Sequence, residues 1–290
     1  MLVYKTICFI EPTLRVTLRV VEKKTFFYYN INAMVRIISV VNQKGGVGKT
    51  TTAVNLSAYL AELGYQVLLV DFDPQGNATS GLGHTPAEID FSIYDVLIDE
   101  PRQIDSIIKP TALAKLQLVP ANQNLAGANI DLVATSRREF RLWDNISTIS
   151  KNYDFIIIDN PPSLGLLAIN GLVAADEVLI PVQTEYYALE GLGQLLNTIQ
   201  LVKENLKPDL VVLGAVMTMY DGRSKLSEAV FYELYKYFPN KIFRSIIPRN
   251  VKLAEAPSHG KPIMHYDRKS RGAKAYEKLA REVINVKKYY

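Results

Sequence analysis

Residues 41–51 read VNQKGGVGKTT, and this stretch decides how the rest of the chain is interpreted. An apolar run with strand character, 37–41, leads into it, and a helical pattern over 53–63 follows. A strand, a glycine-rich turn and a helix form the context in which phosphate-binding loops occur. The glycines let successive backbone N–H groups point at phosphate oxygens, and the helix N-terminus adds its positive end. We therefore expect Lys49 to hold the β- and γ-phosphates of a nucleotide and Thr50 to ligate Mg²⁺.

The loop departs from the ordinary pattern G-x-x-x-x-G-K-[ST] near its start. Gln43 replaces the first glycine and Lys44 follows it. Two ammonium groups on the same phosphates would repel each other, so Lys44 is better placed to reach a nucleotide bound by a second subunit. The loop resembles the deviant Walker A motif, K-G-G-x-G-K-[ST], of the ATPase family that includes ParA/Soj partitioning proteins, MinD and the nitrogenase iron protein. This resemblance implies an ATP site made by Lys44, Gly45, Gly46, Val47, Gly48, Lys49, Thr50 and Thr51.

The composition is that of an ordinary globular protein. Of the 290 residues, 48% are hydrophobic and 21% charged. No segment reaches the roughly 18 consecutive apolar residues that span a bilayer. The only cysteine is Cys8, which rules out a disulfide framework or a cysteine-based metal site and indicates a reducing cytoplasm. The three histidines lack metal-ligand spacing.

The first 33 residues do not resemble the remainder. They lack turn punctuation and helix caps, whereas a strand pattern begins directly after Met34 and runs into the phosphate loop. We expect 1–33 to be a non-native or disordered extension and Met34 to be the true start; the alternative is a genuine N-terminal strand or DNA-binding arm. The extension holds five basic and two acidic residues of a chain with formal charge +4, so 34–290 carry about +1. Bulk charge therefore gives no argument for nucleic-acid binding.

From Met34 onward, apolar strand-like runs alternate with helical periodicity, which predicts one α/β domain over 34–290. The runs are continuous rather than alternating, so we expect a mostly parallel, twisted sheet with helices on both faces. The expected strands are 37–42, 66–72, 116–120, 155–159, 177–182, 210–218 and 241–246. The expected helices are 53–63, 92–99, the region around 124–148, 163–174, 189–204, 226–237 and 270–286.

Two further motifs carry carboxylates to the carboxyl edge of this sheet, where ligands bind. One strand ends in Asp71 and Asp73, which alternation points to the same side. One carboxylate can support Mg²⁺ and the other can orient the attacking water; in the resembling ATPases the position of Asp73 is the one tied to hydrolysis. The run 155–159 ends in Asp159, a Walker B carboxylate for the Mg²⁺ shell, and Pro161 begins a loop that can sense the γ-phosphate. The expected metal ligands are thus Thr50, Asp71 and Asp159, and the expected catalytic residues are Lys44, Lys49 and Asp73.

With all three motifs present, the resemblance narrows to the ParA/Soj subfamily and covers essentially all of 34–290. It rests on the stretches 71–83, 159–167, 181–192 and 247–263. The resemblance implies an ATP- and Mg²⁺-dependent ATPase whose ATP-bound sandwich dimer binds DNA without sequence preference. It also implies a ParB-type partner that stimulates hydrolysis and releases the protein from DNA, so that chromosome or plasmid DNA is positioned. The expected location is the cytoplasm, on the nucleoid.

The same resemblance places DNA contacts and an adenine pocket in two loops that follow strands. Family members use basic residues in these regions, which implies DNA contacts by Arg223, Arg249 and Lys252. Such contacts to phosphate would be sequence-independent and sensitive to salt. Pro248 and Asn250 are expected to line the adenine pocket.

Two other functions were weighed against this interpretation. A membrane-associated ATPase of the MinD type ends in a basic amphipathic helix that lies on lipid. The segment 275–288 is amphipathic, but acidic residues interrupt its polar side, which favours a helix packed on the domain. We therefore expect no stable membrane association. A nitrogenase-like reductase is excluded because 34–290 contain no cysteine for its cluster.

Overall fold

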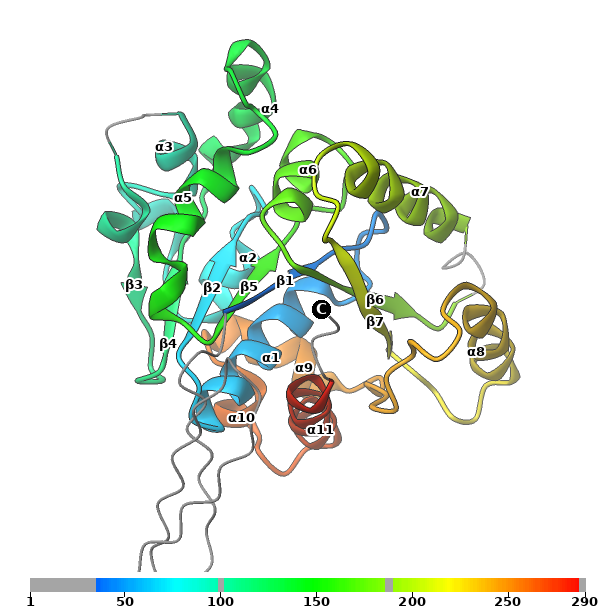
Figure 1. Ribbon diagram of the computed structural model, residues 1–290. Coiled ribbons are helices and arrows are strands. Elements are labelled where there is room, and N and C mark those ends of the chain that lie inside the picture. Colours follow the sequence, from blue (N-terminus) through cyan, green and yellow to red (C-terminus); the bar gives the residue numbers. More distant parts are fainter. Residues whose placement is uncertain (1–34, 99–101, 186–189, 287–290) are drawn as a thin grey trace, which may run out of the picture. The chain divides into compact units, whose positions relative to one another are not determined.

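The computed structural model describes residues 35–98, 102–185 and 190–286 (Figure 1). The expectation for 1–33 falls outside the described residues and stays a prediction.

A seven-stranded sheet forms the centre of the domain, in the order β3-β4-β2-β5-β1-β6-β7 (Figure 1). Only β3 runs antiparallel to its neighbour, and the other pairings are parallel. The predicted mostly parallel sheet is therefore confirmed. The strands are β1 (Arg36–Val40), β2 (Val67–Asp71), β3 (Lys109–Pro110), β4 (Leu116–Val119), β5 (Phe155–Asp159), β6 (Glu177–Gln183) and β7 (Val211–Thr218).

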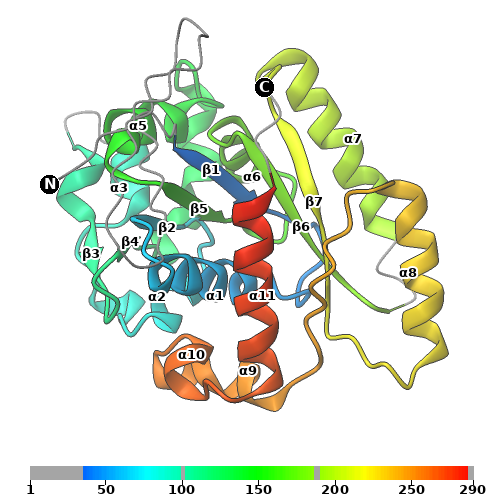
Figure 2. The same cartoon turned by 60° about the horizontal axis from the view of Figure 1, so that its bottom comes forward.

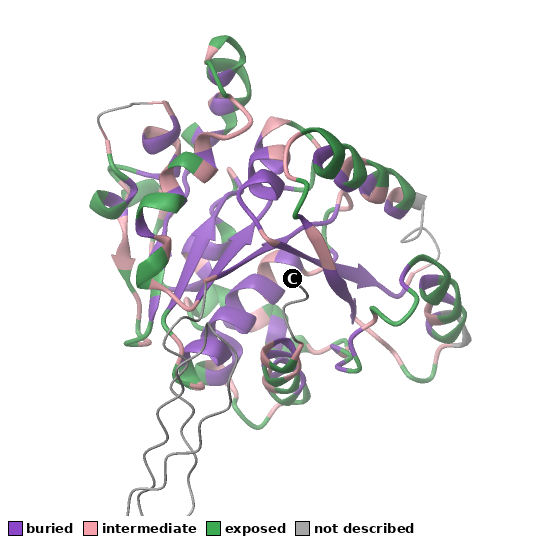
Figure 3. Cartoon of the chain, in the orientation of Figure 1, coloured by how far each residue is buried: buried purple, intermediate pink, exposed green. Residues whose placement is uncertain are grey.

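Helices cover both faces of the sheet, as predicted, because both sides of its strands are apolar. Neighbouring side chains such as Ile37 and Ile38 enter two different cores, one on each face. Figure 3 shows most of the sheet coloured as buried. One core is shared with α1 (Lys49–Glu62), α2 (Asn77–Gly81), α9 (Val251–Glu255), α10 (Ile263–Tyr266) and α11 (Arg271–Asn285), and Figure 2 shows α1 and α11 side by side. The other is shared with α3 (Ile93–Ile98), α4 (Ala128–Asp131), α5 (Arg141–Ile149), α6 (Leu166–Val173), α7 (Glu190–Asn205) and α8 (Lys225–Tyr237).

The predicted helical region 124–148 is broken. Short 3₁₀ turns flank α4, and the chain straightens at Thr135 before α5 begins at Arg141. Arg137 adopts a left-handed conformation, with φ of 54°, which no continuous helix can contain. The apolar spacing predicts helical structure correctly, but it does not indicate the break at 135–137.

The predicted strand 241–246 was wrong. This segment lies beside β7 and forms only an isolated bridge, between Ala215 and Ile242. Beyond it, the backbone N–H groups of Arg244 and Ser245 donate to the carboxylate of Glu282 on α11, at 2.7 and 3.0 Å. A side chain that is distant in sequence thus satisfies both backbone donors, and the pairing with β7 does not continue through them.

The strand order places β1 at the point where the chain changes direction across the sheet. After β1 the chain moves to β2 on the far side of β5, whereas β6 and β7 extend the sheet the other way. Ligands of open α/β sheets bind at the carboxyl ends of strands at such a point. The loop after β1 occupies this position.

Candidate nucleotide site

The loop between β1 and α1 has the backbone shape of a phosphate cradle. Gly46 and Gly48 have φ of 74° and 87°, a left-handed conformation that glycine adopts without steric cost. Gly48 is also the N-cap of α1. From the neighbouring β7, the Thr218 hydroxyl donates a 2.8 Å hydrogen bond to the carbonyl of Val47. The loop is therefore fixed from outside as well as by its own sequence.

Lys49 is buried at the start of α1, with 6% of its surface exposed. Its Nζ donates to the carbonyl oxygen of Lys44, 3.1 Å away. Burial lowers the pKa of Lys49, and the nearby carboxylates of Asp159 and Asp73 act in the opposite direction. A buried ammonium with one neutral partner is well suited to an anionic ligand such as a phosphate.

Asp159 lies at the end of β5, and the register of the strands sets it beside Asp71 at the end of β2. Both carboxylate oxygens are buried, and neither has a hydrogen-bond partner of ordinary geometry among the described residues. Burial and the charge of Asp71 raise the pKa of Asp159 well above its usual value, while the Thr50 hydroxyl nearby favours the ionised form. A buried carboxylate whose oxygens have no such hydrogen-bond partner, beside a hydroxyl, is an oxygen donor set that suits Mg²⁺. The predicted pair Thr50 and Asp159 fits this ion.

Asp71 is engaged within its own segment. Its Oδ2 accepts 2.7 Å hydrogen bonds from both the backbone N–H and the hydroxyl of Thr79 on α2, and its Oδ1 accepts from the backbone N–H of Asp73. The same Thr79 hydroxyl accepts from the N–H of Ala121. Burial raises the pKa of Asp71 to about 6 against these hydrogen bonds. Asp71 thus anchors the turn after β2, and Thr79 is a residue that the sequence interpretation missed.

Asp73 follows in that turn, and 6% of its surface is exposed. Its Oδ1 accepts a 2.9 Å hydrogen bond from the N–H of Gln75. Its charge contributes to the surroundings of both Lys49 and Asp159. The predicted residues Lys49, Asp73 and Asp159 are therefore close enough to affect one another's charge at the edge of the sheet.

Lys44 points elsewhere. Its backbone N–H donates to the Asn42 side chain, but its Nζ lies 3.3 Å from Oε2 of Glu185, which follows β6. The Lys44 side chain is 32% exposed. The two loop lysines therefore do not converge on one set of phosphates.

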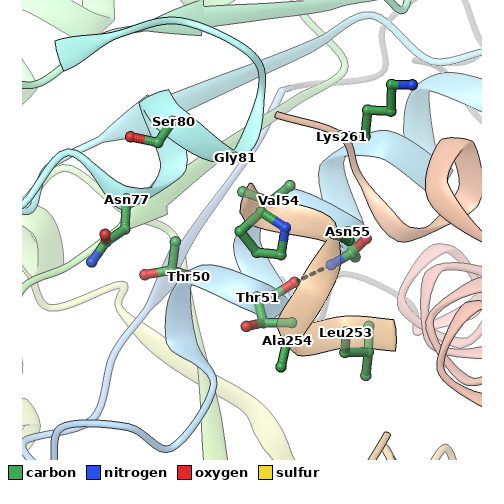
Figure 4. Close-up of a pocket in the computed structure, with 12 residues that line it drawn as sticks. Thr50, Thr51, Val54, Asn55, Asn77, Ser80, Gly81, Leu253, Ala254 and Lys261 are labelled. Carbon is green, nitrogen blue, oxygen red and sulfur yellow. Dashed lines mark hydrogen bonds between the residues drawn. The ribbon is translucent and has the colours of Figure 1, made fainter. Parts of the chain in front are cut away.

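A cavity of about 330 Å³ adjoins the start of α1 (Figure 4). Its walls come from α1, from α2, and from α9 with the turn after it. Pro248 and Asn250 are not among the residues that line it. The Asn250 side chain caps α9 by accepting from the N–H of Lys252, at 2.8 Å. The lining residues are Thr50, Thr51, Val54, Asn55, Asn77, Ser80, Gly81, Leu253, Ala254, Ala256, Pro257 and Lys261.

Of the three predicted DNA-binding residues, Arg223 and Arg249 lie on loops, whereas Lys252 lies in α9 and not in a loop as predicted. Each of the three is paired with an acid. The Arg223 side chain is 92% exposed and bonds Asp221 through two nitrogens, each at 3.1 Å. Lys252 bonds Glu255 one turn along α9. Arg249 lies 3.7 Å from Oε1 of Glu185. Backbone hydrogen bonds at Tyr220 link the two loops that carry Arg223 and Arg249.

Sequence comparison places the chain in a family. A model described as "AAA domain" matches residues 35–212. The sporulation initiation inhibitor protein Soj of Bacillus subtilis is 57% identical over 250 residues, 86% of this chain and 98% of that protein. The chain belongs to the ParA/Soj family of partitioning ATPases. The chromosome partitioning protein ParA of Myxococcus xanthus is 53% identical over 86% of this chain and 88% of its own length.

Solved structures agree with the fold and come with nucleotides. Cobyrinic acid a,c-diamide synthase from Mycobacterium smegmatis, with a bound ATP analogue and magnesium, has a TM-score of 0.78 at 38% identity and covers 86% of this chain and 94% of its own. The septum site-determining protein MinD of Pyrococcus horikoshii, complexed with Mg-ADP, has a TM-score of 0.71 at 29% identity, covering 87% and 97%. This chain therefore shares its overall fold with these nucleotide-bound proteins.

Proposed function

We propose that this protein is an ATP-dependent DNA-segregation ATPase that works as a nucleotide-switched dimer. In the ATP-bound state two copies enclose two nucleotides and bind duplex DNA without sequence preference. A ParB-type partner stimulates hydrolysis, and the protein then leaves the DNA. The cycle positions chromosome or plasmid DNA on the nucleoid in the cytoplasm.

The observation that carries the proposal is the separation of the two loop lysines. Lys49 is buried in its own cradle, whereas the partly exposed Lys44 side chain points to Glu185 and away from that cradle. A cation that belongs to the loop but not to its own nucleotide site is suited to a nucleotide on another copy. The 57% identity to Soj and the names of the curated relatives, chromosome partitioning proteins, support the same function.

The residues at the sheet edge would divide the chemistry of hydrolysis. Lys49 would hold the β- and γ-phosphates, and the loop N–H groups would bind their oxygens. Thr50 and Asp159 would hold Mg²⁺, which supplies charge neutralisation at the phosphates when bound. Asp73 would orient the attacking water, and Asp71 would keep the Asp73 turn in place through Thr79. Lys44 of a second copy would add positive charge at the γ-phosphate.

The packing of α11 argues against lipid as the surface that this protein binds. The apolar side of α11, with Tyr276, Leu279 and Val283, is buried in the core that it shares with α1. The Tyr276 hydroxyl also hydrogen-bonds that of Thr52 on α1, at 3.1 Å. An interfacial helix needs a free apolar face. In the parts of the chain that the structure describes, no helix is long and apolar enough to cross a membrane.

The experiment that tests the proposal is binding to random-sequence duplex DNA, compared between ATP and ADP at two salt concentrations. We expect tight binding with ATP only, weakening steeply as salt rises. Equal binding in both nucleotide states, or none in either, would overturn the proposed switch. Repeating the experiment with a chain that starts at Met34 tests our further proposal that residues 34–290 hold the complete ATPase and DNA-binding activity.

A further inference from the structure

One carboxylate contacts both the loop lysine and a predicted DNA-binding arginine. Glu185 follows β6; its Oε2 lies 3.3 Å from Lys44 Nζ and its Oε1 lies 3.7 Å from an Arg249 guanidinium nitrogen. The Gln183 side chain donates a 2.6 Å hydrogen bond to the same Oε1. The carboxylate is therefore held between the two cations, one on the phosphate loop and one on the loop before α9.

The base of Glu185 is fixed, whereas the lysine is free to move. The preceding Thr184 donates its N–H to the carbonyl of Thr218 on β7, and its hydroxyl accepts from Ser227 on α8. Lys44 carries its ammonium on a flexible four-carbon stem whose side chain is 32% exposed. Arg249 is 66% exposed. A ligand that attracts Lys44 can therefore take the cation away from Glu185, while the hydrogen bonds of Thr184 hold the backbone that carries Glu185.

We propose that Glu185 is a positioning residue that couples dimer formation to DNA binding. In the unpartnered chain it holds Lys44 against its own subunit and neutralises part of the charge of Arg249. When Lys44 leaves for the nucleotide of a second copy, Glu185 keeps Arg249 as its one remaining cation in this cluster and attracts it more strongly. DNA phosphates must then compete with Glu185 for Arg249, so the carboxylate opposes both dimer formation and DNA binding. This inference rests on the proposed function.

The size of the effect follows from the exposure of the contacts. One exposed ion pair changes an equilibrium constant by roughly 1.4- to 5-fold. Because a symmetric dimer releases Lys44 twice, removing the charge of Glu185 would tighten the dimer dissociation constant by about 2- to 25-fold, at low ionic strength most of all. The substitution Glu185→Gln removes the charge and keeps the shape of the side chain.

The experiment measures the full chain with a non-hydrolysable ATP analogue and Mg²⁺. Analytical ultracentrifugation over a series of protein concentrations gives the dimer constant, and fluorescence anisotropy gives binding to random duplex DNA. Labelling of Lys44 by an amine-reactive reagent in ADP reports the ion pair without any dimer. For Glu185→Gln we expect a tighter dimer, DNA binding at lower protein concentration and faster labelling of Lys44.

Two control variants separate the proposed coupling from a general change of charge. Glu233→Gln removes an equally exposed acid that pairs with Lys236 on α8, and it should change neither dimer nor Lys44 labelling. In an Arg249→Ala background, adding Glu185→Gln should still tighten the dimer. DNA affinity should then rise only as far as the tighter dimer explains, with no additional gain. If Glu185→Gln raises DNA affinity as much without Arg249 as with it, the carboxylate repels DNA directly and the link to Arg249 is overturned.

The outcomes of this experiment distinguish the inference from the function on which it rests. If the wild-type chain dimerises and binds DNA with the analogue but Glu185→Gln leaves the dimer constant unchanged, the proposed function stands and the role of Glu185 is wrong. If the wild-type chain does neither, the proposed function fails and the coupling fails with it. Unchanged labelling of Lys44 would overturn the ion pair itself.

Discussion

The carboxyl edge of β1, β2 and β5 and the loops beside β7 both carry functional candidates, but they hold them in different ways. At the first edge, Lys49, Asp71 and Asp159 are buried, and backbone geometry fixes them. Beside β7, Arg223 and Arg249 are largely exposed and contact single carboxylates. Buried charges must be compensated, so their positions indicate a ligand. Exposed ion pairs form and break with little change in free energy. The positions of the charges beside β7 are therefore weaker evidence for a ligand.

The largest effect that tests this contrast is expected from Lys49→Ala. The variant removes the one cation buried in the cradle, so we expect nucleotide binding to fall by at least about 100-fold, as for loss of a charged group in a desolvated site. Titration with a fluorescent ATP analogue measures it. Lys44→Ala is the matched control, because its ammonium lies outside the cradle; it should keep nucleotide binding in the monomer and lose the dimer.

The second effect concerns Asp73→Ala. We expect ATP binding to persist while hydrolysis falls by about 100-fold or more, because the group that we propose to orient the water is lost. The ATP dimer should then stay on DNA, which single-turnover hydrolysis and dissociation from a DNA-coated surface together measure. A variant that hydrolyses ATP at the wild-type rate would place the water-orienting group elsewhere.

The third effect is a dependence of stability on pH in Mg²⁺-free buffer. The folded-state pKa of Asp71 is about 6, above the ordinary value of 3.8, and that of Asp159 is raised in the same direction. The folded state therefore binds more protons than the unfolded state between about pH 4 and 6. It follows that the free energy of unfolding falls as pH rises through this window, and the raised pKa of Asp159 acts in the same direction. Thermal unfolding without nucleotide, measured across this range, checks the sign.

Asp159→Asn sharpens that test. The amide removes a buried charge without a partner of ordinary geometry, so in Mg²⁺-free buffer at pH 7.5 we expect a Tm higher by a few degrees. Added Mg²⁺ with ATP should raise the Tm of the wild-type chain far more than that of the variant. Equal stabilisation of both would mean that Asp159 does not support the ion.

The smallest effects are expected beside β7. Arg249→Ala should weaken DNA binding severalfold and lower the slope of log K against log salt by about 1, as for one phosphate contact. Lys252→Ala should have a smaller effect, because Lys252 already pairs with Glu255 and lies over Tyr266. A salt slope unchanged by Arg249→Ala would remove this loop from the DNA surface.

Local sequence predicted the carboxyl edge of β1, β2 and β5 far better than the loops beside β7. The strand–loop–helix pattern and the two strand-terminal aspartates were sufficient for the sheet edge, because parallel strands bring their carboxyl ends together whatever the rest of the chain does. The metal-ligand role of Asp71 stays a prediction. In the structure the Thr79 hydroxyl on α2 donates to one of its oxygens, a contact between residues eight apart that the sequence did not indicate. The strand predicted at 241–246 is absent beyond one bridge, and there Glu282 accepts hydrogen bonds from the N–H groups of Arg244 and Ser245. Glu282 is 38 and 37 residues away from them, so no local pattern indicates this contact.

The sequence by itself determined the family, the α/β sheet and the phosphate loop, since each depends on periodicity and on glycine, lysine and aspartate at short spacing. Only the tertiary structure decided where Lys44 points. Its partner Glu185 lies 141 residues away, and β6 carries this residue to the loop by pairing with β1. No local pattern relates those two positions. The sheet register that places them side by side is a property of the folded chain, set by the burial of both faces of β1 and β6.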